Sequence, residues 1–185
     1  MKIHKILSLC LALLFITACN QSRVNDELKE APQKWESLHE SGYSIQYPHD
    51  WTLDKSGQSG TSFIVLSQQK SPDDLFRENV NLLIQDLSGL NIDLDKYTEI
   101  SLDQVRTMLT KGKITENVKR SARGLPYQKV VYTGIQGIYE ISCQQYYWVR
   151  DNKAYVLTLT CETDKVETYQ ETGEMILNSF KFDNI

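Results

Sequence analysis

Cys19 is the residue for which the sequence gives the most specific chemical signal. Lys2 and Lys5 precede an apolar run of 11 residues, Ile6–Ile16, and two small residues follow it directly before Cys19. A membrane-spanning helix needs about 20 apolar residues, so this arrangement is typical of a secretory signal instead. We therefore expect residues 1–18 to be a signal peptide and the chain to leave the cytoplasm.

The four residues Ile16–Cys19 also resemble a bacterial lipobox. The resemblance implies that the thiol of Cys19 forms a thioether with diacylglycerol and that Cys19 becomes the first residue of the mature protein. Each buried methylene contributes about 0.8 kcal/mol, so two or three acyl chains hold a protein at a bilayer almost irreversibly. Asn20 replaces the Asp that favours inner-membrane retention in enteric bacteria, so we expect an outer-membrane anchor facing the periplasm. The alternative is an ordinary secretory signal with an incidental thiol.

Cys143 and Cys161 are the other two cysteines of the mature chain, and they would also lie outside the cytoplasm. They fall in two predicted strands, 138–150 and 153–162, joined by a short turn. If the numbers of opposed residues sum to 304, Cys143 faces Cys161 and the apolar residues of both strands share one face. Opposed Cα atoms at a non-hydrogen-bonded position lie about 4.5 Å apart, a separation that a disulfide accepts. We predict a Cys143–Cys161 disulfide; the alternative is two buried free thiols.

Residues that could bind a metal are sparse. His39 and His49 are the histidines of the mature chain, and both lie at predicted turns without the further Cys or His ligands that zinc requires. The pairs Asp73–Asp74 and Asp93–Asp95 lack the glycine and the distal glutamate of a calcium loop, so we interpret them as turn or cap residues. We predict no metal site and no cofactor.

The sequence lacks the common signatures of catalysis. It has no Gly-x-Ser-x-Gly elbow, phosphate loop or dinucleotide fingerprint, and Gly57-x-x-Gly60 lies in a short polar loop. Glu140 and Glu162 would share the polar face in the predicted register, but paired carboxylates are common on solvated sheets. We therefore predict no catalytic residues, and an enzyme is disfavoured.

Charge and composition divide the mature chain into a tether and one domain. Residues 19–185 carry 18 Lys and Arg against 24 Asp and Glu, a net charge of −6. This acidic balance disfavours nucleic-acid binding and a second, electrostatic hold on anionic lipid. Residues 19–33 are polar, which predicts a flexible lipidated tether, and residues 20–33 could reach about 45 Å when extended. Residues 34–185 suffice for a single domain with its own core.

Short alternating apolar runs from Trp35 onward predict a sheet. The predicted strands are 35–38, 43–47, 63–66, 79–86, 114–118, 129–133, 138–150 and 153–162. The first two flank a turn and predict a hairpin.

Two helices are predicted among these strands. Apolar residues at three- and four-residue steps predict the first from Leu94 to Leu109, with Asp93 or Asp95 as cap and Gly112 ending the segment. The second begins behind Thr163 or Asp164, and Asp164 and Glu167 have the spacing of a capping box. Gly173 lies inside this helix, where it costs about 1 kcal/mol relative to Ala, so we expect close packing there.

Aromatic residues concentrate on the strands 138–150 and 153–162: Tyr139, Tyr146, Tyr147, Trp148 and Tyr155. Tyr146 and Trp148 point to the face opposite Tyr147. In a sheet covered on both sides these residues form core, which is the interpretation we favour. If one face were open, they would form a recognition surface.

The order of several short motifs resembles PsbP-like and DcrB-like domains. These motifs are Gly42–Pro48 with Trp51, Arg77–Leu83, Gly124–Pro126, Ala154–Thr158 and Leu177–Phe182. The resemblance covers nearly all of residues 35–182 and implies an α+β fold, a three-layer α/β/α sandwich around a largely antiparallel sheet. It also implies a mostly non-catalytic family that includes envelope lipoproteins, and it carries over no functional residue.

Two hypotheses for function follow. The first is a non-catalytic bacterial envelope lipoprotein that acts as an interaction or assembly module, with the membrane and an envelope protein as partners. The alternative is a carrier of a small hydrophobic ligand that uses a pocket between the sheet and the helices. No nucleic-acid partner is expected.

Overall fold

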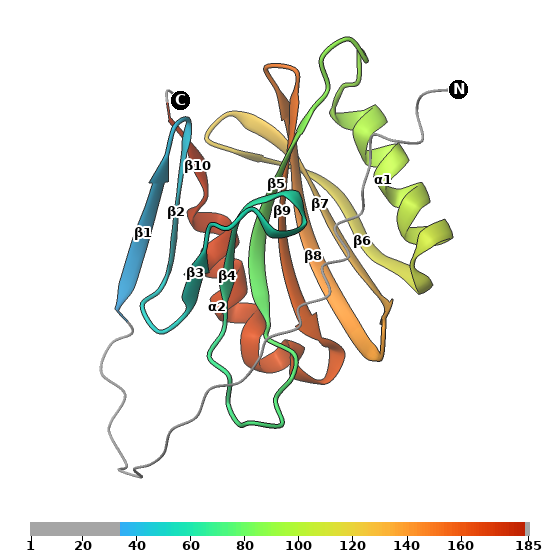
Figure 1. The fold of residues 1–185 in the computed structure, drawn as a ribbon. Coiled ribbons are helices and arrows are strands. Elements are labelled where there is room, and N and C mark those ends of the chain that lie inside the picture. Colours follow the sequence, from blue (N-terminus) through green and yellow to red (C-terminus); the bar gives the residue numbers. More distant parts are fainter. Residues whose placement is uncertain (1–33, 184–185) are drawn as a thin grey trace.

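The computed structural model describes residues 34–183, so the predicted signal peptide, Cys19 and the tether lie outside the described residues. The strands and helices of this part are drawn in Figure 1. They are β1 (Trp35–Glu40), β2 (Tyr43–Pro48), β3 (Thr52–Asp54), β4 (Thr61–Leu66), β5 (Asn79–Asp86), α1 (Leu94–Met108), β6 (Thr110–Ala122), β7 (Leu125–Gln136), β8 (Tyr139–Arg150), β9 (Lys153–Glu162), α2 (Val166–Ser179) and β10 (Lys181–Phe182). None of the helices in this part is long and apolar enough to cross a bilayer.

The strands form two antiparallel sheets. The larger has seven strands in the order β3-β4-β5-β9-β8-β7-β6, and the smaller has three in the order β1-β2-β10. The predicted hairpin of β1 and β2 is confirmed, and β5 and β9 have the predicted bounds. Strands β6 and β7 run for 13 and 12 residues, well beyond the short strands predicted there, and β6 forms one edge of the larger sheet.

Both faces of the larger sheet are covered. Helix α1 packs on β6, β7 and β8 on one face, whereas α2 packs on β5 and β9 on the other face and also contacts β2 of the smaller sheet (Figure 1). The predicted α+β class with a largely antiparallel sheet is thus confirmed. The expected α/β/α layering holds only in part, because α2 shares its side of the sheet with the three-stranded sheet.

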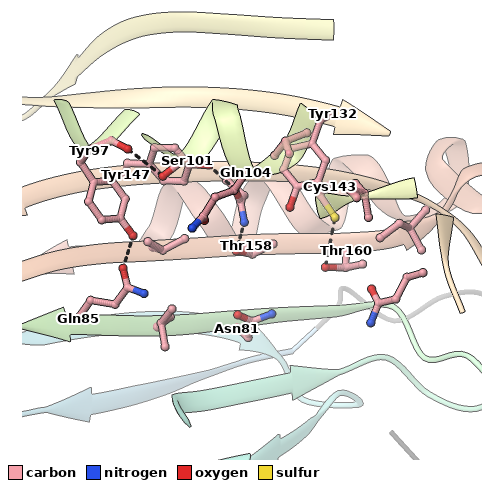
Figure 2. Close-up of a pocket in the computed structure, with 17 residues that line it drawn as sticks. Asn81, Gln85, Tyr97, Ser101, Gln104, Tyr132, Cys143, Tyr147, Thr158 and Thr160 are labelled. Atoms are coloured by element: carbon pink, nitrogen blue, oxygen red, sulfur yellow. Dashed lines mark hydrogen bonds between the residues drawn. The ribbon is translucent and has the colours of Figure 1, made fainter. Parts of the chain in front are cut away.

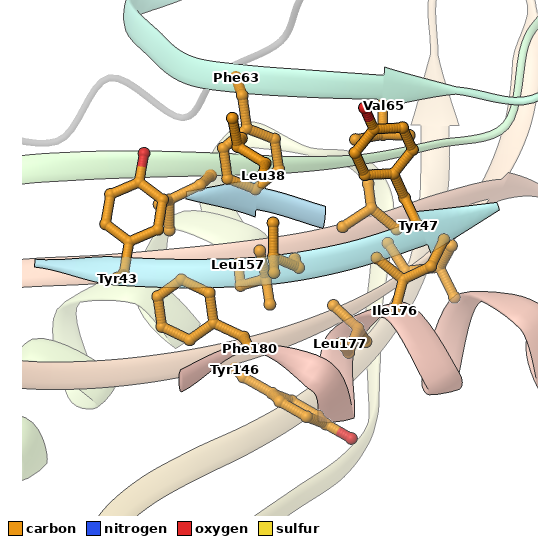
Figure 3. Close-up of a cluster of buried hydrophobic side chains, with 14 of the residues drawn as sticks. Leu38, Tyr43, Tyr47, Phe63, Val65, Tyr146, Leu157, Ile176, Leu177 and Phe180 are labelled. Carbon is orange, nitrogen blue, oxygen red and sulfur yellow. The ribbon is translucent and has the colours of Figure 1, made fainter. Parts of the chain in front are cut away.

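Two hydrophobic clusters result, one on each face. The α2-side cluster includes Tyr43 and Phe63 with Leu157 and Leu177, and Figure 3 shows these side chains between the two sheets and α2. The α1-side cluster includes Val130, Tyr147 and Val156 with residues of the helix. Strand β9 contributes to both clusters through alternate residues, so it is buried on both sides.

Helix α1 begins and ends close to the predicted positions. The carboxylate of Asp93 accepts a hydrogen bond of 2.8 Å from the backbone N–H of Lys96, which confirms Asp93 as the N-cap. The helix ends at Met108, and the N–H of Gly112 donates to the carbonyl of Leu109. A Cβ at Gly112 would lie 2.1 Å from the carbonyl oxygen of Val105, so only glycine fits this turn into β6.

Helix α2 begins later than predicted, and the predicted capping box is wrong. A 3-10 turn, Thr163–Lys165, precedes the helix, and Lys165 occupies the N-cap position without a side-chain cap. The side chain of Lys165 instead pairs with Glu162 at 2.5 Å and with Asp74 at 2.8 Å. The ion pair with Asp74 connects this turn to the loop before β5.

The expected close packing at Gly173 is confirmed. A Cβ at this position would lie 2.4 Å from Cδ2 of Leu159 on β9, within the α2-side cluster. Glycine therefore allows the helix to approach the sheet closely.

We expect Gly173→Ala to destabilise the protein. The gain of about 1 kcal/mol in helix propensity is offset by overpacking against Leu159, which costs about 1–3 kcal/mol. Urea unfolding would measure the difference, with Thr168→Ala, at an exposed position of the same helix, as a control that changes propensity without overpacking. A Gly173→Ala protein clearly more stable than wild type would contradict the packing argument.

Candidate functional site

A cavity of about 70 Å³ lies between helix α1 and strands β5, β7, β8 and β9. Figure 2 shows side chains from the helix and from the sheet around it. Five of the lining side chains are carboxamides: Asn81, Gln85, Gln104, Gln136 and Gln145. Hydroxyl groups of Tyr, Ser and Thr line much of the remainder, so the pocket is far more polar than the carrier hypothesis expected.

Hydrogen bonds hold the polar side chains of the cavity in place. The hydroxyl of Tyr147 donates to Oε1 of Gln145, and Nε2 of Gln145 donates to the hydroxyl of Thr158 at 3.0 Å. Near the N-terminus of α1, the hydroxyl of Tyr97 donates to Oε1 of Gln85 (Figure 2). Because a buried polar group is costly unless it is hydrogen-bonded, these bonds explain how so many amides and hydroxyls lie beneath a helix.

The cavity is electrically neutral. None of the described residues that line it is Asp, Glu, Lys, Arg or His. Burial raises the pKa of Cys143 to about 11 and raises the pKa of Tyr132 and of Tyr147 well above the usual value. These groups therefore stay protonated at neutral pH, and the cavity offers hydrogen bonds to water or a small uncharged polar group.

The predicted register of the two cysteine strands is wrong by one residue. Cys143 lies opposite Thr160, and Cys161 lies opposite Ser142, so the residue numbers of opposed pairs sum to 303. Neighbouring positions of a strand point to opposite faces, which places Cys143 in the α1-side cluster and Cys161 in the α2-side cluster.

The predicted Cys143–Cys161 disulfide is absent from the structure, in which both are buried free cysteines. The reason is that the register was inferred from apolar residues sharing one face, whereas both faces of β8 and β9 are covered. Cys143 donates instead to the hydroxyl of Thr160 at 3.8 Å. Burial raises the pKa of Cys161 to about 12, so neither thiol is a reactive thiolate.

We expect Cys143 and Cys161 to resist alkylation in the folded protein. Both are buried and protonated, and thiol reagents attack the thiolate. Intact mass of the mature Cys19→Ser protein should therefore show no label under native conditions, and two labels in denaturant without reductant. If only reductant together with denaturant allowed labelling, the cysteines would be bridged.

The remaining candidate residues are not brought together. His49 pairs with Glu36 through an Nδ1–Oε1 contact of 2.5 Å on the surface, and His39 is exposed on β1. Glu162 lies opposite Ile141, so it shares no face with Glu140. Among residues 34–183 no cluster of His, Cys, Asp or Glu could hold a metal ion.

Three aromatic residues of β8 form core, as favoured by the sequence, whereas Tyr139 is partly buried. Tyr146, Tyr147 and Trp148 are all buried. The ring centroids of Trp148 and Phe180 lie 5.2 Å apart, and the ring of Phe182 stacks edge-on against Trp148 at 5.9 Å. These contacts fix the C-terminal segment against the sheet, so these three side chains are no exposed recognition surface.

Glu78 is a buried ionisable residue that the sequence did not single out. Its side chain is fully buried directly before β5, where Oε2 accepts a hydrogen bond of 3.3 Å from Ser67 and Oε1 lies 3.8 Å from Nζ of Lys165. Burial raises the pKa of Glu78 despite the nearby cation. A glutamate at the start of a strand is usually exposed, so no local pattern could have indicated this burial.

We expect Glu78→Gln to gain stability over wild type as the pH rises from about 4 to 8. The pKa of Glu78 is raised in the folded state, so protonated Glu78 contributes fully to the free energy of unfolding below the unfolded-state pKa. This contribution is lost from the wild-type protein as the pH rises through the folded-state pKa. Urea unfolding at several pH values would measure this, with the exposed Glu171→Gln as control. Parallel pH curves for wild type and Glu78→Gln would contradict the expected burial penalty.

Comparison with known proteins identifies the class to which this fold belongs. The model of the PsbP-like protein family matches residues 16–182. The chain therefore belongs to the PsbP-like family, as its motifs implied. A search of curated protein sequences found no match.

Three solved structures are similar to this chain at low sequence identity. Cyanobacterial PsbP (CyanoP) from Synechocystis sp. PCC 6803 is 13% identical with a TM-score of 0.58, covering 86% of this chain and 98% of its own. LpqN of Mycobacterium tuberculosis, which is involved in cell envelope biogenesis, is 12% identical with a TM-score of 0.56, covering 83% and 87%. A Pseudomonas aeruginosa protein of unknown function is 14% identical with a TM-score of 0.54, covering 80% and 94%. At these identities the likeness establishes the fold alone.

Proposed function

We propose that this protein is a non-enzymatic lipoprotein of the bacterial envelope that serves as an interaction or assembly module for an envelope complex. The observation that supports the proposal is the order of features along the sequence: the predicted secretory signal, Cys19 and the predicted polar tether precede a PsbP-like domain. Diacylglycerol on Cys19 would anchor the domain at the outer membrane, facing the periplasm. The likeness to LpqN, a protein of cell envelope biogenesis, supports an envelope role.

The chemistry of the cavity also favours binding over reaction. Its lining residues form neutral hydrogen bonds among themselves, and its thiol and phenols are held protonated by burial. General acid–base catalysis requires a group whose pKa lies near the operating pH, and these groups are shifted away from it.

Crosslinking the full-length protein in living cells would test the module. We expect a reproducible envelope protein to be captured, and we expect its capture to be lost in Cys19→Ser, because the variant is not held at the membrane. Mass spectrometry of the crosslinked peptides would identify the contact face. Equal capture by wild type and Cys19→Ser would contradict a role for the anchor, and capture of abundant neighbours alone would contradict the module.

A small-molecule carrier is the second candidate, and the cavity beneath α1 is the observation that favours it. The volume of about 70 Å³ and the amide-rich lining favour a small uncharged polar molecule over the hydrophobic ligand first expected. A molecule that co-purifies with the folded protein and is released on unfolding would favour the carrier over the module.

A further inference from the structure

The basic residues of the domain are concentrated at one edge of the larger sheet. The segment from Arg106 to Lys129, which spans the end of α1, strand β6 and the start of β7, holds seven Lys and Arg but a single acidic residue, Glu116. Its net charge is +6, whereas the other residues between 34 and 183 hold nine Lys and Arg against 20 Asp and Glu, a net charge of −11. The acidic total charge of the chain therefore conceals a strongly basic edge.

Most of these cations form no ion pair within the described part of the chain. Lys119 pairs with Asp95 at 2.6 Å, and Lys129 pairs with Glu116 at 3.1 Å. The other five form no ion pair with any carboxylate in residues 34–183, and all five are exposed: Arg106, Lys111, Lys113, Arg120 and Arg123. Exposed cations that have no ion-pair partner in the described part of the domain are available to an external anionic partner.

Exposed apolar side chains lie at one end of this basic edge. Met108 at the end of α1 is 62% exposed, and Ile138 in the turn between β7 and β8 is 85% exposed. Both belong to the same end of the sheet, because Thr110 pairs with Ile135, three residues before Ile138. Cations beside exposed apolar side chains are typical of a surface that touches both the headgroups and the outer acyl region of a bilayer.

The backbone of β6 is less suited to adding a strand from a partner protein. Its pairing with β7 is interrupted by register shifts between Thr110 and Lys113 and between Ile114 and Glu116. Bulges and edge lysines are features that discourage strand addition. The basic side chains also extend from α1 past β6 to the hairpin that follows it, a span of about 40 Å that suits a broad charged surface.

We propose that this basic edge, defined by Arg106, Lys111, Lys113, Arg120 and Arg123 with Met108 and Ile138, docks on the surface of an anionic phospholipid bilayer. The inference rests on the proposed lipid anchor at Cys19, which would keep the domain close to a bilayer. Residues 20–33 could reach about 45 Å when extended, comparable to the diameter of about 40 Å expected for a domain of this size. The tether is thus long enough for the edge to reach the same membrane that holds the anchor.

Vesicle binding by the mature Cys19→Ser protein tests the docking surface without the acyl chains. Vesicles of phosphatidylcholine with and without phosphatidylglycerol are the probes, at low salt and at about 0.15 M salt, where screening weakens exposed charges. We expect binding to the phosphatidylglycerol vesicles alone, weakened by salt. Each basic residue near such a surface raises the partition coefficient about fivefold.

A matched pair of variants separates the edge from the total charge. The edge variant combines Lys111→Asn, Lys113→Gln, Arg120→Gln and Arg123→Asn, with Asn at the two positions whose backbone φ is positive. The control variant replaces four exposed lysines elsewhere with Gln: Lys34, Lys70, Lys153 and Lys181. We expect the edge variant to bind at least about 30-fold more weakly and the control variant less than about threefold more weakly. Circular dichroism and thermal unfolding would verify that both variants are folded.

A separate variant, Met108→Ser with Ile138→Ser, tests how the exposed apolar side chains contribute to vesicle binding. A loss of binding that persists at high salt would support insertion of these side chains into the bilayer. Equal losses in the edge and control variants, or no binding of the Cys19→Ser protein to phosphatidylglycerol vesicles, would overturn the proposal. If the edge residues crosslinked to an acidic protein in cells while vesicles did not bind, the edge would be a protein interface instead. The edge variant with Cys19 intact should remain anchored at the membrane. This control distinguishes failure of the docking surface from failure of the proposed lipid anchor.

Discussion

Burial of strands β8 and β9 on both faces is the constraint on which the rest of the structure depends. Tyr147 and Trp148 are neighbours on β8, yet each is buried, the first beneath α1 and the second beneath α2 and the C-terminal segment. Such a strand needs other elements packed on both of its faces, and these elements come from distant segments of the chain. The β1–β2 hairpin at its start and α2 with β10 at its end cover one face, and α1 from the middle of the chain covers the other.

The two covers differ in chemistry. On the α2 side the contacts are close and apolar, to the extent that Gly173 is needed for the helix to pass Leu159. On the α1 side the sheet presents Gln145 and Thr158, and a hydrogen bond between these two side chains replaces apolar packing. Amides that must keep their hydrogen-bond geometry cannot interdigitate as alkyl groups do, so a cavity remains beneath α1.

The sequence predicted those parts of the fold in which local signals and burial agree. The bounds of β5 and β9 and the cap at Asp93 follow from patterns of a few residues. The register of β8 on β9 could not be inferred, because the usual argument assumes that one face is solvated. Strand β6 was predicted too short because it is an edge strand whose residues are mostly polar and exposed, so few apolar residues mark its length.

The candidate site was harder to predict than the fold. Its carboxamides come from α1, β5, β7 and β8, and no spacing in the sequence relates Asn81 to Gln136. Glu78 escaped notice for a similar reason, because its partner Lys165 is supplied by a turn far along the chain. The family resemblance conveyed the fold, but it named no functional side chain, since a shared fold does not determine a site.

The distribution of charge bears on how a tethered domain is oriented. A domain with a uniform charge of its net sign would be repelled from an anionic surface in every orientation, and only the anchor would hold it there. In the proposed docking, the basic edge along β6 would be attracted to the bilayer, while the rest of the domain, at a net charge of −11, would be repelled. Attraction and repulsion would rotate the domain toward the same orientation, so a weak attraction would suffice to select it. The opposite edge of the larger sheet, formed by β3, would then be directed away from the lipid, where a partner of an envelope complex could reach it.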